Sequence, residues 1–137
     1  MVKSECSCYT IRYSEALSMT EMIWHQQVSG DVLQEGLDLL LTSLQEDKTN
    51  YLLIDTRSLA FFGPTDQRWI RKVFLPKLSG KHVKRFARII GPDTLNQAII
   101  SNILCSVQER RSTYTFVVES FYERDEALEW LLEPICV

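Results

Sequence analysis

Short apolar runs alternate along the chain with longer segments in which apolar residues recur every three or four positions. The short runs are typical of strands, because side chains in a strand project alternately to its two faces. YTIRY alternates as a half-buried strand does, and YLLID has the consecutive apolar residues of a strand covered on both faces. We predict strands at Tyr9–Tyr13, from Glu21 to Val28, at Tyr51–Asp55, from Lys84 to Ile90 and at Thr115–Glu119.

The longer segments have the period of helices with one apolar face. The first helix is expected to begin after Ser29, a suitable N-cap, and to end near Asp47. Pro76 should end or kink the second helix, because proline lacks a backbone donor and clashes with the preceding turn. A third helix is predicted after a cap at Asp93 or Thr94, and ERDEALEWLL predicts a fourth near the carboxyl end.

Strands that alternate with helices predict right-handed crossovers and a mainly parallel sheet, with the amino-terminal strand free to run antiparallel at an edge. The expected fold is α/β, a four- or five-stranded mixed sheet with four helices in the order β β α β α β α β α. A chain of 137 residues fits one domain. We expect residues 1–137 to form it, with residues 1–7 as a flexible amino terminus.

Composition narrows the class of protein. The apolar (45%) and charged (24%) fractions are those of an ordinary globular domain. No apolar run approaches the roughly 20 residues that span a bilayer, and the first residues lack the core of a secretory signal. We therefore expect a cytoplasmic protein without a membrane span. Its four cysteines, which include a lone Cys6-x-Cys8, are expected to be reduced, with no metal and no cofactor bound.

Charge is unevenly distributed along the chain. Eight basic residues and no acidic one lie between Arg68 and Arg88, although the net charge is -3. This stretch is either a solvated surface or a positive face that attracts an acidic protein partner. Nucleic acid is not expected as a partner, because no aromatic residues alternate with the charges. The proposed basic face consists of Arg68, Arg71, Lys72, Lys81 and Lys84.

The segments YLLIDTRSLAFFGPTDQRW, FLPKLSGKHVKRFARI and FYERDEALEWL resemble the SpoIIAA-like, or STAS-like, family related to bacterial anti-sigma-factor antagonists. The chain is most similar to a subgroup of small stand-alone bacterial proteins, mostly uncharacterised, and the resemblance covers nearly the whole chain from Tyr9. It implies the same fold and a regulatory, protein-binding role. In the antagonists, a serine at the start of the second helix is phosphorylated by a partner kinase.

The matching stretch in this chain is Gly63-Pro64-Thr65-Asp66, which lacks the acid–hydroxyl order of the family. We therefore predict a strand-to-helix corner rather than a phosphorylated switch, with Pro64 as first helical residue. Asp55 is expected to accept backbone donors of the next loop and to pair with Arg57. A working site at the carboxyl end of the strand is the alternative. The candidate interaction or ligand corner is Asp55, Arg57, Ser58, Thr65, Asp66 and Trp69.

No nucleophile elbow, glycine-rich phosphate loop or zinc-protease motif is present in the sequence, and we expect no enzyme activity. The first functional hypothesis is a regulatory protein-interaction module. The alternative is a small-molecule or lipid-binding domain with a pocket beside the second helix. An apolar pocket with polar groups near Asp55 and Trp69 would favour the alternative, and a flat corner the first. We also expect a homodimer, because FARII and TFVVE place apolar groups on both faces of the sheet.

Overall fold

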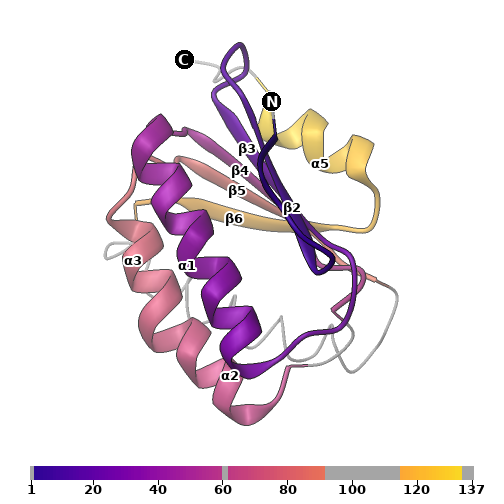
Figure 1. Cartoon of the computed structure of the whole chain (residues 1–137). Helices are drawn as coiled ribbons and strands as arrows, with labels where there is room; N and C mark the ends of the chain where they lie inside the picture. Colours follow the sequence, from indigo (N-terminus) through magenta and orange to yellow (C-terminus); the bar gives the residue numbers. More distant parts are fainter. Residues whose placement is uncertain (1, 60–61, 92–114, 134–137) are drawn as a thin grey trace.

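A mixed sheet of six strands forms the centre of the described structure (Figure 1). The computed structural model describes residues 2–59, 62–91 and 115–133. β1 to β3 pair antiparallel, whereas β3 to β6 pair in parallel. The carboxyl ends of the four parallel strands therefore lie on the same side of the sheet. The strands lie side by side in chain order: β1 (Val2–Glu5), β2 (Tyr9–Ser14), β3 (Met19–Trp24), β4 (Tyr51–Asp55), β5 (Arg85–Ile89) and β6 (Val117–Phe121).

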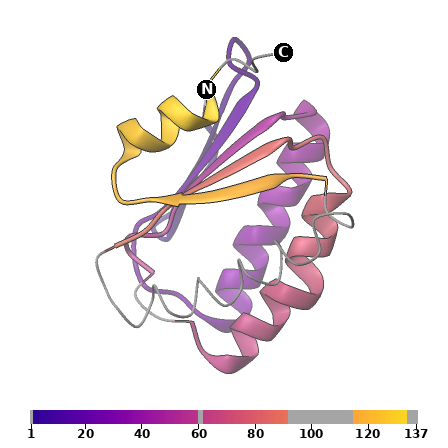
Figure 2. The same ribbon diagram turned by 180° about the vertical axis from the view of Figure 1, so that it is seen from behind.

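Helices cover both faces of this sheet (Figures 1 and 2). One face carries α1 (Gly30–Asp47) and a continuous helical segment made of α2 (Pro64–Trp69), η1 (Ile70–Phe74) and α3 (Leu75–Ser79). The opposite face carries α5 (Arg124–Leu131), which packs on β4, β5 and β6. Because side chains alternate between the two faces of each strand, the sheet contributes residues to two apolar cores.

β4 shows how the sequence supplies these two cores. Leu52 and Ile54 point to the face with α1, and Leu53 points to the face with α5. All three side chains are buried, as the consecutive apolar run predicts. The larger core lies under α1 and the α2–η1–α3 segment, and the smaller core packs Ala127 and Leu131 of α5 against the sheet.

The second helical segment widens before Pro76 instead of ending there. The Leu75 N–H donates to the carbonyl of Ile70, five residues earlier, which is the bond of a π-helix. Pro76 has no N–H, and its ring would crowd the carbonyl four residues before it. A widened turn relieves this crowding, and the helical segment continues to Ser79.

The mixed, mainly parallel sheet is confirmed, but the predicted number of four or five strands is wrong. Val2–Glu5, expected to be part of a flexible terminus, pairs with β2 as an edge strand. β6 begins at Val117 and not at Thr115. The helix predicted from Asp93 or Thr94 lies outside the described residues, within which α1, the α2–η1–α3 segment and α5 are the helical elements.

Candidate functional site

Asp55 ends β4 and forms an ion pair with Arg57, as predicted. Arg57 Nη2 donates to Asp55 Oδ2 over 2.7 Å, and Arg57 Nε donates to Oδ1 over 3.1 Å. The backbone N–H of Arg57 also donates to Oδ1. The hydrogen bonds to Asp55 raise the pKa of Arg57 above its ordinary value. The carboxylate of Asp55 is therefore fully engaged in holding the loop after β4.

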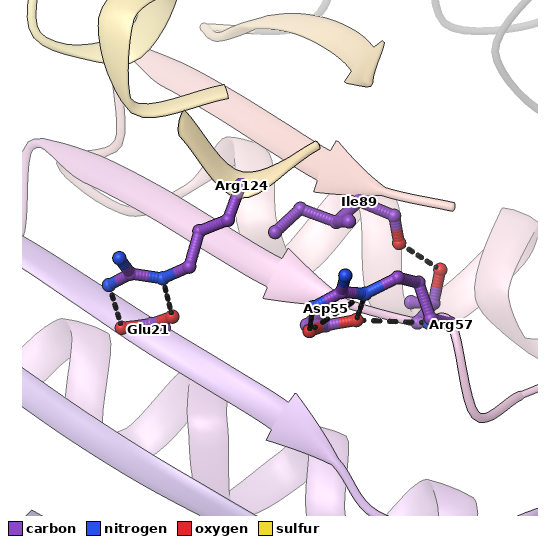
Figure 3. A network of polar contacts seen from close by, with 6 residues as sticks. Glu21, Asp55, Arg57, Ile89 and Arg124 are labelled. Atoms are coloured by element: carbon purple, nitrogen blue, oxygen red, sulfur yellow. Dashed lines mark hydrogen bonds and ion pairs between the residues drawn. The ribbon is translucent and has the colours of Figure 1, made fainter. Parts of the chain in front are cut away.

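A second arginine–carboxylate pair lies beside the first (Figure 3). Arg124, the first residue of α5, donates from Nε and Nη2 to the two carboxylate oxygens of Glu21, each over 2.9 Å. Hydrogen bonding to Glu21 raises the pKa of Arg124. The Glu21 side chain is only 6% exposed, whereas that of Arg124 is 45% exposed. This pair attaches the start of α5 to β3.

The remaining residues of the predicted corner do not converge on one site. Ser58 and Thr65 are exposed. Asp66 is buried, and its Oδ1 accepts a hydrogen bond of 3.0 Å from the backbone N–H of Gly30, the first residue of α1. Trp69 is partly buried and packs against the larger core. Asp55 therefore fixes the loop after β4, and Asp66 joins α2 to the start of α1.

An apolar pocket lies between the sheet, α1 and the α2–η1–α3 segment. Its free volume is about 50 Å³. The sheet, the loop after β4 and the two helical elements all contribute side chains. The described residues of its lining are Trp24, Leu33, Leu37, Ile54, Thr56, Leu59, Phe62, Ile70, Phe74, Leu75, Phe86 and Arg88.

Arg88 is the one charged residue among the described residues of this lining. Its side chain is almost completely withdrawn from solvent, with 8% of the residue exposed. None of the described residues accepts a hydrogen bond from its guanidinium or forms an ion pair with it. Burial lowers the pKa of Arg88 to about 10, which leaves the guanidinium charged at neutral pH.

Sequence reasoning missed Arg88 because it treated all basic residues from Arg68 to Arg88 as one surface stretch. The signal that could have found it is the alternation within β5. Phe86 and Arg88 lie on one face of the strand, and Ala87 and Ile89 lie on the other. In a strand covered on both faces, that spacing places the guanidinium in the core.

The other basic residues have the surface positions that the sequence suggested. Arg68, Arg71 and Lys72 lie exposed on α2 and η1, on the segment whose inner side lines the pocket. Lys84 is also exposed, whereas Lys81 is partly buried. An acidic protein partner for this face stays a prediction.

The cysteine residues form no cluster in the described part of the chain. Cys6 and Cys8 are free thiols, and Cys8 lies just before β2. Cys105 and Cys136 lie outside the described residues. Over residues 2–59, 62–91 and 115–133, no group of three or more His, Cys, Asp or Glu side chains is placed to hold a metal ion. Within the same ranges, no helix has the length and apolar character needed to cross a membrane.

The second face of the sheet, expected to need another copy of the chain as cover, is partly covered by α5. Met19, Leu53 and Ile89 pack there with Ala127 and Leu131 of the same chain. Val117, which shares this face of β6 with Phe121, is 57% exposed. The homodimer stays a prediction.

Comparisons with known proteins support the fold. No family model and no curated protein matches the chain. The crystal structure of an uncharacterised protein of the DUF3478 family from Shewanella loihica PV-4, with a SpoIIAA-like fold, is similar, with a TM-score of 0.58. The two chains are 19% identical, and the match covers 94% of this chain and 98% of the other. The resemblance to SpoIIAA-like proteins is thus confirmed for the fold.

Proposed function

We propose that this chain is a non-enzymatic binding module that takes a small, largely apolar molecule into the pocket beside α2, η1 and α3. The observation that carries this proposal is the pocket itself, which is walled by two helical elements and the sheet. Trp24, Thr56 and Arg88 place it toward the carboxyl ends of parallel strands, where open α/β sheets commonly bind ligands. Of the two hypotheses raised by the sequence, this geometry favours the small-molecule alternative.

We include the absence of catalysis in this proposal, and the two buried carboxylates of the sheet, Glu21 on β3 and Asp55 on β4, support it. A general base needs a carboxylate that is free to accept a proton. Asp55 and Glu21 are each held by two or more hydrogen bonds from an arginine. Their arrangement serves to fix a loop and a helix.

The pocket can be probed with dissolved xenon, which enters apolar cavities. In amide NMR spectra of the whole chain, we expect xenon to shift resonances around Leu33, Leu37 and Phe74. Leu37→Phe should abolish the shifts, because the larger ring fills the pocket. Leu39→Phe is the matched control, since Leu39 lies on the same helix and is 37% exposed.

A panel of short neutral and acidic compounds, scored by the thermal midpoint of the chain, then tests the function. Compounds that raise the midpoint of the natural chain and of Leu39→Phe, but not of Leu37→Phe, would support the proposal. Shifts that persist in Leu37→Phe, or no shift with xenon or any compound, would contradict it.

We further propose that the module is regulatory and that its basic face meets an acidic protein. The same helical segment presents Arg68, Arg71 and Lys72 outward and lines the pocket with Ile70 and Phe74. A ligand that shifts this helical segment would therefore also move the basic residues on its outer side. Binding of poly-glutamate at low salt should weaken at least tenfold when the three basic residues are changed to glutamate. Unchanged binding would contradict this role.

A further inference from the structure

The buried guanidinium of Arg88 has no hydrogen-bond or ion-pair partner among the described residues. A buried charge without a partner is unfavourable, and proteins usually pair such groups or connect them by hydrogen bonds. Arg57 and Arg124, both far more exposed, each hold a carboxylate in this same structure. Arg88 is 8% exposed and holds none of the described carboxylates. An anion from outside the described chain would supply the missing partner.

The neighbours of Arg88 in the sheet leave its charge unpaired. In register, Arg88 lies between Ile54 of β4 and Ser120 of β6. Partners in register project to the same face of a parallel sheet. The Ser120 hydroxyl is buried and has no hydrogen-bond partner among the described residues. Two polar groups with unused hydrogen-bonding capacity therefore stand on adjacent strands.

The shape and polarity of the pocket limit the kind of anion. A free volume of about 50 Å³ limits the occupant to a small molecule. Leu33, Leu37 and Phe74 offer contacts to carbon atoms only, whereas Arg88 offers a planar set of donors that matches two carboxylate oxygens. A phosphate dianion would bring more charge than one arginine neutralises. A carboxylate on a short hydrocarbon chain would pair with Arg88 and contact the apolar side chains of the lining.

We infer that Arg88 binds the carboxylate of a short-chain aliphatic acid in this pocket, an inference that rests on the proposed function. The hydrocarbon part of the acid lies against Trp24 and the helical wall. The ligand neutralises the buried guanidinium and replaces its lost water. The pocket is therefore selective for a monoanion over a neutral molecule of the same shape.

Butyrate and its neutral amide, butyramide, are matched probes of this selectivity. Each is titrated into the whole labelled chain at pH 7 and constant ionic strength, and the Arg88 Nε–H and pocket amide resonances are followed by NMR. We expect saturable binding of butyrate with Kd on the order of 1 mM. Butyramide should bind at least tenfold more weakly, because it offers the guanidinium one acceptor oxygen instead of two and brings no countercharge to the buried group.

Arg88→Met should remove the difference between the two probes by weakening butyrate at least tenfold. Arg12→Met, at an exposed position of β2, is the control and should leave both affinities unchanged. Equal binding of butyrate and butyramide by the natural chain would overturn the role of Arg88 while leaving the pocket as a site for neutral molecules. The comparison of butyrate with butyramide uses the natural chain alone. It therefore tests whether Arg88 binds a carboxylate even if Arg88→Met fails to fold.

Discussion

Arg88 and Ser120 are register partners on β5 and β6, and neither side chain has a hydrogen-bond partner among the described residues. Interiors rarely leave such groups unpaired, and each one lowers the stability of the fold. In this chain the pair lies on the pocket face of the sheet. We interpret the loss of stability as the consequence of keeping a binding group ready for a ligand.

Arg88→Met should make the ligand-free chain more stable. Methionine has a similar length and no charge, so the substitution should raise the free energy of unfolding by about 1 to 4 kcal/mol. Urea denaturation at pH 7 measures this change, and Arg12→Met should remain within about 0.5 kcal/mol of the natural chain. A clear destabilisation by Arg88→Met would mean that the guanidinium already has a partner.

Gly36→Ala should destabilise the chain even though alanine is the better helix former. A Cβ at position 36 would lie 2.6 Å from the ring atom Cη2 of Trp24, a residue of the pocket lining. Overpacking of this kind costs about 1 to 3 kcal/mol. Gly80→Ala is the control, because its nearest contact would be 3.5 Å away, and it should change stability by less than about 1 kcal/mol. Equal effects in thermal unfolding would refute the packing argument.

Asp66→Ala should cost more stability than Thr65→Ala, its neighbour in the same helical turn. Asp66 is buried and accepts the hydrogen bond from Gly30, so its loss should cost about 1 to 2 kcal/mol. Thr65 is exposed, and its loss should cost at most about 1 kcal/mol. Intact mass of the natural chain should show no phosphate on Thr65. A phosphate there would restore the switch that the resemblance implies.

Arg124→Met should destabilise the chain more than Glu21→Gln does. Without Arg124, the carboxylate of Glu21 stays buried and unpaired, at a cost of about 1 to 3 kcal/mol. Glutamine keeps the shape of Glu21, and the half-exposed guanidinium of Arg124 can turn to water. We expect the second change to cost less than about 1 kcal/mol. Similar costs in urea denaturation would contradict this asymmetry.

The sequence predicted those features that depend on neighbouring residues. β2 and β4 followed from their apolar patterns, the start of α2 from Pro64, and the Asp55–Arg57 pair from a separation of two residues. β1 was missed because VKSE has no apolar pattern and gains its place only by pairing with β2.

Contacts between distant segments could not be predicted in this way. The Gly30–Asp66 bond joins residues 36 positions apart, and the Glu21–Arg124 pair joins residues 103 positions apart. The pocket depends on the packing of two helical elements over the sheet, which no local pattern specifies. Arg88 lay within reach of sequence reasoning, but only if each residue of β5 had been assigned to a face.

The most direct test of the pocket and of its charged residue is a crystal structure of the whole chain grown in sodium butyrate, compared with one grown in sodium chloride. We predict density for a carboxylate about 2.7 to 2.9 Å from the Arg88 guanidinium, with the hydrocarbon chain against Trp24. A pocket that is empty in both crystals, with Arg88 paired to another residue of the chain, would contradict the account.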